Sequence, residues 1–343
     1  LLAPPIITKI NDQDEVLVVF GSNKGIIYAL DGNGKLLWTF DSKEEINQTE
    51  MMFFDVETAN SIQSSPNVYD LNGDDKHEIL FGTEMGHVYA LTIEGKCLWS
   101  YKAQGSVRGG IIIKDINGDG TPEVIFGCGD GCIYILNNKG KLLNRCEIGV
   151  PIESTPETLG SKIIFGANDG FVYCINYDGK EVWKFKTKAK ILAKPKIAKF
   201  SGDNYQILIG STDYHLYSLN EDGELFWDFK TNGAIYSEVS LADINNDKKL
   251  EIVFGSCDNN VYALNHKGEK IWSYETNFWI VAPVIIYDID DDGKLEIIVG
   301  SYDHYIYVLD ARGHYMLEYV PGISGVMQQT GSYSDIVTYE PGK

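Results

Sequence analysis

The stretch "SEVSLADINNDKKLEIVFGSCDNNVYALNHKGEKIWSYE", from Ser237 to Glu275, contains four short apolar runs separated by turn residues. The runs "SEVSLADI", "LEIVFGS", "NVYALN" and "EKIWSYE" have the length of β-strands and are rich in β-branched and aromatic residues. The turn from Asn265 to Gly268 offers residues that accept a positive φ. Because no helical periodicity is present, the stretch predicts one sheet of four strands.

The second of these runs recurs along the whole chain and ends each time on an equivalent glycine. The seven equivalent glycines are Gly21, Gly82, Gly127, Gly166, Gly210, Gly255 and Gly300. Four of the six spacings between them are 44 or 45 residues. The third run places a tyrosine at one equivalent position in every copy: Tyr28, Tyr89, Tyr134, Tyr173, Tyr217, Tyr262 and Tyr307. We interpret these tyrosines as packing residues rather than as a stacking platform for a ligand. A period of this length indicates a repeat array.

Seven units of four short strands predict an all-β fold, a β-propeller of seven antiparallel blades. Each sheet then buries both faces against its neighbours, and ring closure protects the strand edges. The prediction treats residues 1–343 as a single domain with an insertion between the first two blades at 41–63. Residues 321–343 form a tail that closes the ring or makes a partial eighth blade.

Composition limits the classes of partner. With a net charge of -20 and a pI near 4.6, the chain has no Lys and Arg cluster of the kind that binds nucleic acid. No apolar stretch reaches the roughly 18 residues of a membrane span. The six cysteines form no CxxC pair with zinc spacing. Buried thiols are expected, with a disulfide between Cys128 and Cys132 as the alternative.

Two motifs resemble known propeller repeats. The pattern "GxxYALxxxGKxLW", seen from Gly25 to Trp38 and from Gly86 to Trp99, resembles the pyrroloquinoline-quinone-type repeat. The segments of the form "DxNxDGxxEIxFG", such as the one from Asp115 to Gly127, resemble the FG-GAP repeat of integrin α-subunits. Both resemblances imply a β-propeller and say little about function.

The acidic segments predict calcium sites, because alternate positions in a tight loop turn their oxygens toward one centre and Ca²⁺ takes six to eight oxygen ligands. The alternative is a hairpin turn whose side chains cap backbone N–H groups. We expect a structural role for the ions and no organic cofactor. The candidate ligands occupy loop positions 1, 3, 5 and 9 in four blades: Asp70, Asn72, Asp74, Glu78; Asp115, Asn117, Asp119, Glu123; Asp243, Asn245, Asp247, Glu251; Asp288, Asp290, Asp292, Glu296.

The opposite ends of the strands predict a face for a ligand or partner. The connections between blades vary there, where a scaffold would repeat, which is typical of a binding surface. The candidate residues of this face are Gln63, Arg108, Glu153, Leu192, Tyr236, Trp279 and Val281. Five equivalent aspartates in the neighbouring hairpin loops are interpreted as turn residues: Asp130, Asp169, Asp213, Asp258 and Asp303. Met51 to Phe54 in the insertion and Phe278 add apolar groups.

No serine, cysteine or histidine motif of a known catalytic class occurs. The favoured hypothesis is therefore a non-enzymatic, calcium-stabilised propeller that binds a protein or a glycan. The alternatives are a propeller enzyme, either a quinone-dependent dehydrogenase or a polysaccharide lyase or hydrolase, and an extracytoplasmic sensor domain of a larger receptor. Calcium loops favour an extracytoplasmic location: periplasmic, cell-surface or secreted.

Overall fold

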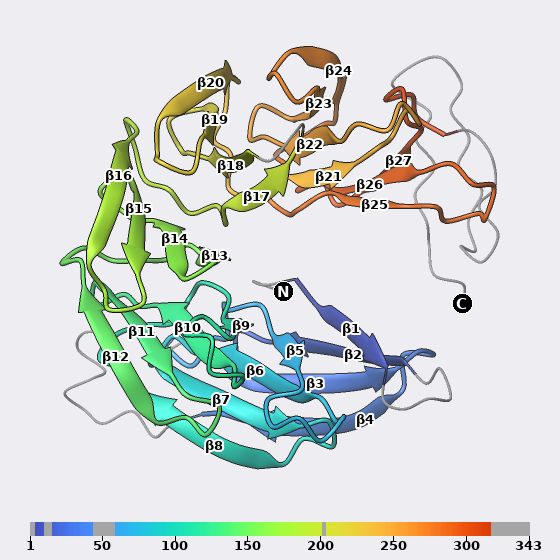
Figure 1. The fold of residues 1–343 in the computed structure, drawn as a ribbon. Helices are drawn as coiled ribbons and strands as arrows, with labels where there is room; N and C mark the ends of the chain where they lie inside the picture. The colour runs from blue at the N-terminus through green and yellow to red at the C-terminus, as the bar shows by residue number, and fades with distance from the viewer. Residues whose placement is uncertain (1–3, 10–15, 44–58, 201–203, 317–343) are drawn as a thin grey trace. The chain divides into compact units, whose positions relative to one another are not determined.

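The structure is a computed structural model that describes residues 4–9, 16–43, 59–200 and 204–316 (Figure 1). The described residues form seven antiparallel sheets and contain no helix. Six sheets have four strands, and the last has three described strands. The chain divides into two compact units, Leu1–Pro195 with four sheets and Lys196–Lys343 with three. The fold class expected from the repeat, a seven-bladed β-propeller with four-stranded blades, is confirmed.

Four blades make up unit one, and each follows the chain from its first strand to its fourth. Blade one has β1 (Ile6–Lys9), β2 (Val16–Gly21), β3 (Ile26–Asp31) and β4 (Leu36–Asp41). Blade two has β5 (Asn67–Tyr69), β6 (Glu78–Gly82), β7 (His87–Thr92) and β8 (Cys97–Lys102). Blade three has β9 (Ile112–Lys114), β10 (Glu123–Gly127), β11 (Cys132–Leu136) and β12 (Leu142–Glu147). Blade four has β13 (Glu157–Leu159), β14 (Lys162–Gly166), β15 (Phe171–Asn176) and β16 (Glu181–Lys186).

Unit two holds the remaining three blades. Blade five has β17 (Lys196–Lys199), β18 (Tyr205–Gly210), β19 (His215–Leu219) and β20 (Leu225–Lys230). Blade six has β21 (Ser240–Ala242), β22 (Glu251–Gly255), β23 (Asn260–Leu264) and β24 (Lys270–Glu275). Blade seven has β25 (Ile285–Tyr287), β26 (Glu296–Gly300) and β27 (Ile306–Leu309), and Tyr315 bridges back to Leu309.

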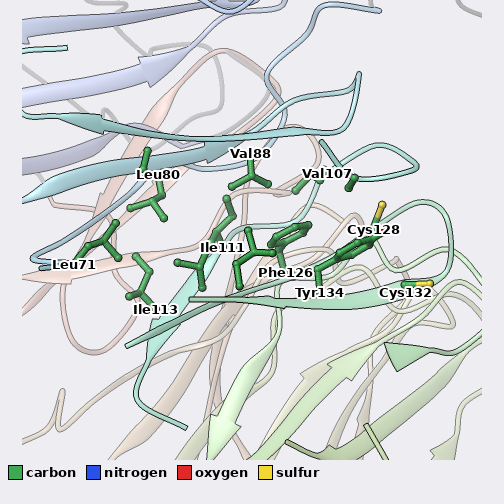
Figure 2. Close-up of a cluster of buried hydrophobic side chains, with 14 residues drawn as sticks. Leu71, Leu80, Val88, Val107, Ile111, Ile113, Phe126, Cys128, Cys132 and Tyr134 are labelled. Atoms are coloured by element: carbon green, nitrogen blue, oxygen red, sulfur yellow. The ribbon is translucent and has the colours of Figure 1, made fainter. Parts of the chain in front are cut away.

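The second and third strands of each blade carry the core, because both of their faces are covered. In blade three every residue of β10 and β11 is buried. Phe126 of β10 stacks on Tyr134 of β11 with ring centroids 5.3 Å apart, and Figure 2 shows the two rings side by side within a cluster of buried apolar side chains. The repeated tyrosine is therefore a packing residue, as expected. The near-continuous apolar runs of these strands follow from burial on both faces.

The glycine that ends each second strand leaves room for the connection to the next blade. A Cβ atom on Gly255 would overlap the side chain of Ile280, and the same holds for five further pairs: Gly21 with Ile62, Gly82 with Val107, Gly127 with Ile152, Gly166 with Ile191 and Gly210 with Ile235. Among the described residues, none has an atom within 4 Å of the Cβ position of Gly300 in the last blade. The repeat therefore keeps glycine at this position because a β-branched side chain packs directly against the backbone.

The tryptophan of the fourth strand joins neighbouring blades within a unit. The indole N–H of Trp38 donates to the carbonyl of Ile93 in the next blade, at 3.0 Å. Trp99, Trp227 and Trp272 repeat this bond. Blade three has Asn144 in place of tryptophan, and its amide donates to the carbonyl of Tyr177 at 3.0 Å. The contact between blades is therefore preserved without the indole ring.

Two of the sequence predictions fall outside the described residues. They are most of the insertion at 41–63, including Met51 to Phe54, and the tail at 321–343 with the possible eighth blade. All six cysteines are free, and Cys128 and Cys132 are buried thiols. The alternative of a Cys128–Cys132 disulfide was wrong. The expectation of buried thiols holds for four of the six cysteines, whereas Cys97 is exposed and Cys257 is half-buried.

Candidate ligand-binding face

The four acidic loops between the first and second strands share one backbone conformation. Their fourth and sixth residues all have positive φ: Gly73 and Asp75, Gly118 and Gly120, Asn246 and Lys248, Asp291 and Gly293. In each loop the first aspartate accepts the backbone N–H of the sixth residue, as Asp70 does from Asp75 at 2.9 Å. Asp70, Asp115, Asp243 and Asp288 therefore cap the loop backbone, as in an Asx turn.

The ninth position of each loop is a glutamate that begins the buried second strand. Glu78, Glu123, Glu251 and Glu296 are only 2–3% exposed. Each accepts the backbone N–H of the second loop residue, with donor to acceptor distances of 2.8–3.1 Å. Burial raises the pKa of all four carboxyl groups above the usual value. Charge on these groups is therefore costly unless a further partner compensates it.

The four loops differ in which of their side-chain groups lie close together. In blade seven, carboxylate oxygens of Asp288, Asp290 and Glu296 lie within 4.8 Å of one another. In blades three and six the third residue is an asparagine whose amide donates to the glutamate, at 2.8 Å from Asn117 and 3.1 Å from Asn245. Within the described residues the blade seven loop alone brings three such groups together. The donor set of that loop suits a hard cation best.

At the other end of the same strands, the hairpin loops contact the connections between blades. The N–H of Glu84 donates to the carbonyl of Ser61, and the N–H of Val107 donates to the carbonyl of Thr83. Equivalent pairs of backbone bonds recur in blades three, four and six. The prediction that hairpin loops and connections share one end of the blades is therefore confirmed.

The five hairpin aspartates stabilise the loops and are not free. Asp130 accepts the hydroxyl of Tyr134 at 2.6 Å and the backbone N–H of Cys132 at 3.1 Å. The other four aspartates make the same two bonds. Although burial opposes ionisation, hydrogen bonds from Tyr134, Cys128 and Arg145 hold the pKa of Asp130 below the usual value. The interpretation of these residues as turn residues is confirmed.

In unit one the structure brings three of the predicted face residues into one network. Arg108 donates from Nε to Glu84, at 2.8 Å, and from Nη1 to Glu153, at 2.6 Å. A second bond, from Nη2 of Arg108, makes the contact with Glu84 bidentate. Gln63 donates to the same carboxylate of Glu84 at 3.3 Å. These side chains satisfy one another, and the paired carboxylates raise the pKa of Arg108.

In unit two the same end of the blades carries exposed aromatic side chains. Five of them lie in the hairpin loops or the connections, with 39–59% of each residue exposed: Tyr214, Tyr236, Phe278, Trp279 and Tyr302. We call this set the aromatic face. The rings of Phe278 and Trp279 stack with centroids 5.1 Å apart and planes 21° apart. Leu192 and Val281, also predicted from the sequence, are half-buried.

Backbone bonds make the segments of the aromatic face continuous. The N–H of Ile235 donates to Ser211 in the hairpin loop of blade five, and the N–H of Cys257 donates to Ala234. The N–H of Tyr302 in blade seven donates to the carbonyl of Trp279 at 2.9 Å. Cys257 and Tyr214 lie close enough to influence the ionisation of Tyr236, whose pKa burial raises. The five aromatic residues therefore belong to one surface.

Sequence analysis missed Glu84, Tyr214 and Tyr302. Each lies in a hairpin loop, whereas the candidates were taken mainly from the connections between blades. A signal was present, because the second and fourth hairpin residues vary between blades: Glu84 and Tyr302 occupy the second position, and Tyr214 the fourth. The same variability had been used to select the residues of the connections.

Comparison with known proteins places this chain among β-propellers. The family model described as the lambda-carrageenase beta-propeller domain matches residues 86–152, 160–226 and 219–319, which together are more than half of the chain. No curated protein sequence matches. The β-propeller part of the sequence resemblance is confirmed. The two specific repeat classes, pyrroloquinoline-quinone-type and FG-GAP, stay predictions.

Solved structures with similar folds differ widely from this chain in sequence. BamB from Moraxella catarrhalis is 19% identical, with a TM-score of 0.58 over 88% of this chain and 82% of that protein. Sqt1 from Saccharomyces cerevisiae is 13% identical, with a TM-score of 0.67 over 90% and 83%. BBS1N, solved in complex with ARL6DN, is 10% identical, with a TM-score of 0.61 over 94% and 93%. In the described part of the chain, no helix has the length and hydropathy needed to cross a membrane.

Proposed function

The chain belongs to the family of the lambda-carrageenase beta-propeller domain, and from this premise we propose that it is a propeller scaffold that binds a carbohydrate through the aromatic face. The family is named for an enzyme that acts on a polysaccharide. The observation that carries the proposal is the aromatic face itself. Tyr214, Tyr236, Phe278, Trp279 and Tyr302 are exposed on loops that a rigid array of sheets holds in place.

The chemistry of an aromatic surface supports a sugar ligand. The faces of aromatic rings carry partial negative charge and attract polarised C–H groups, which line the flat side of a pyranose ring. Tyrosine adds a hydroxyl that can bond to a sugar hydroxyl at the edge of the ring. Aromatic residues also lose little conformational entropy on binding, because they have only two side-chain torsions. Phe278 and Trp279, already stacked, offer the most preorganised part of this surface.

Replacing Trp279 by alanine tests the proposal. We expect the dissociation constant for a galactan oligosaccharide to rise at least about tenfold, because a central aromatic anchor supplies a large share of binding energy. Calorimetric titration with neutral and sulfated galactan oligosaccharides measures this change. The matched control is Phe226→Ala, which removes a ring of similar exposure, 49% against 48%, from β20 and away from the face. Equal effects of the two variants, or capture of a protein ligand with no galactan binding, would contradict the proposal.

We further propose that calcium stabilises the four acidic loops, with blade seven as the strongest site. The supporting observations are the three carboxylates of that loop and the buried glutamates whose pKa values are raised. Ca²⁺ would contribute positive charge beside Asp288, Asp290 and Glu296, and each ion bound only by the folded chain adds to stability. Among the alternative hypotheses, the name of the matching family agrees with a propeller enzyme that acts on polysaccharide. The quinone-dependent dehydrogenase, the sensor domain and the extracytoplasmic location have no further support.

Calcium titration by calorimetry measures directly how many ions the acidic loops bind. We expect about four ions per chain and a melting temperature that falls when a chelator is added, because ligands of the folded state stabilise it by mass action. In Glu296→Gln, which keeps an acceptor for the N–H of Ile289, one ion fewer should bind. If no calcium bound at millimolar concentration, the proposal would be contradicted, and the aspartates of these loops would serve only to cap backbone N–H groups.

A further inference from the structure

The loops that carry the aromatic face contain four acidic residues, two histidines, His215 and His304, and no lysine or arginine. They comprise residues 211–215, 231–238, 256–260, 276–282 and 301–305. None of these residues is a lysine or an arginine, and four are Asp213, Glu238, Asp258 and Asp303. The equivalent loops of unit one differ, because they include Lys24, Arg108, Lys188 and Lys190. The aromatic face is therefore the part of the loop surface least able to neutralise an anion.

The aspartates near the aromatic face are fixed in place by hydrogen bonds. Asp303 accepts the hydroxyl of Tyr307 at 2.6 Å and the N–H of Asn277 at 3.1 Å. Although burial opposes ionisation, these bonds keep the pKa of Asp303 below its usual value. Asp258 accepts from Tyr262 and from the N–H of Asn232 in the same manner. These negative charges lie in the loops that also hold Tyr302 and Cys257.

An anionic sugar would meet repulsion at this surface. Carrageenan is a galactan that carries sulfate groups, and a sulfate brought to the aromatic face would meet fixed carboxylates and no lysine or arginine within these loops. The net charge of -20 adds a long-range repulsion that salt screens only in part. An uncharged sugar incurs neither cost and keeps the contact with the rings.

We propose that the aromatic face selects uncharged sugars over sulfated sugars. This inference rests on the proposed function and specifies its ligand as a neutral oligosaccharide. The aromatic rings supply attraction that is independent of ligand charge. The absence of lysine and arginine from these loops, together with the fixed aspartates Asp258 and Asp303, disfavours the sulfated sugar relative to the uncharged one.

The test compares one galactan oligosaccharide in its sulfated form and after removal of its sulfates. We expect the desulfated form to bind at least about tenfold more tightly at low salt, with a difference that shrinks as the Debye length falls at high salt. Equal or tighter binding of the sulfated form at low salt would overturn the inference and leave the proposed function intact. Binding of neither form would overturn the proposed function, and the inference with it.

Adding a cation to the aromatic face gives a second, independent result. Asn259 has a φ of 71°, and the equivalent hairpin positions of blades five and seven hold Tyr214 and His304 with φ of 75° and 73°. Since large side chains occupy this position, Asn259→Lys is compatible with the loop. It should strengthen binding of the sulfated form several-fold and leave the desulfated form unchanged. Asn33→Lys, in the exposed turn between β3 and β4, adds the same charge elsewhere and should change neither. If Asn259→Lys and Asn33→Lys strengthened binding of the sulfated form equally, the selection would not arise at the aromatic face, and the inference would be contradicted.

Discussion

Replacing Phe126 by alanine is expected to lower the free energy of unfolding by about 3–5 kcal/mol, the range for large-to-small substitutions of buried aromatic residues. Phe126 has no exposed surface, and its ring stacks on Tyr134 with planes only 2° apart. The cavity would open between strands that are covered on both faces (Figure 2), where little rearrangement can fill it. Urea denaturation followed by circular dichroism measures the change.

Two controls separate cavity formation from other effects of the Phe126 substitution. Phe126→Leu keeps most of the apolar volume and should cost less than about 1.5 kcal/mol. Phe226→Ala removes an aromatic ring that is half-exposed on β20 and should change stability by no more than about 0.5 kcal/mol. If Phe126→Ala behaved like Phe226→Ala, the stacked pair in blade three would not be part of the core.

Replacing Gly255 by alanine is the second large effect, with an expected loss of about 2–3 kcal/mol, at the upper end for overpacking. A Cβ atom at this position would overlap the side chain of Ile280, which packs against the backbone at the end of β22. Ile280 has no exposed surface and belongs to the apolar cluster of blades six and seven, so it has little room to move. The melting temperature and the urea midpoint measure the loss.

The last blade offers a matched control for the Gly255 substitution. Gly300 ends β26 at the equivalent position, yet no atom of the described part of the chain lies within 4 Å of its Cβ position. Gly300→Ala should therefore change stability little. Combining Gly255→Ala with Ile280→Ala removes the shortest contact, with Cγ2 of Ile280, and leaves the contact with its Cβ at 2.7 Å. The double variant should therefore lose less than the two single losses added together. Equal destabilisation by Gly255→Ala and Gly300→Ala would mean that backbone conformation, and not the contact with Ile280, selects glycine.

The same loop positions produce two kinds of surface, one in each unit. Arg108 with Glu84 and Glu153 forms a satisfied ionic network in unit one. In unit two, Tyr236 occupies the position equivalent to Arg108 and Glu153, and Tyr302 occupies the position equivalent to Glu84. The repeated framework tolerates either set because these residues lie in loops and not in the packed strands. Variation at such positions can therefore change the ligand without changing the fold.

Much of the architecture was predictable from the sequence, because it depends on local patterns that repeat. The apolar runs define the strands, turn residues such as those from Asn265 to Gly268 define the hairpins, and the spacing of the glycines defines the blades. The hairpin aspartates were also recognisable, since each bonds within its own loop, as Asp130 does with Cys132. Contacts between residues only a few positions apart depend mainly on the identity of those residues, so the local sequence predicts them.

Tertiary structure decided which residues from separate segments meet. Glu84 and Glu153 lie far apart in the chain, and only the packing of successive blades brings both to Arg108. In the same way, Tyr214 and Tyr302 join Trp279 on one face through backbone bonds between loops of three blades. Spacing along the chain shows that such side chains share one end of their strands. It does not show which of them touch, because that depends on the contacts between sheets.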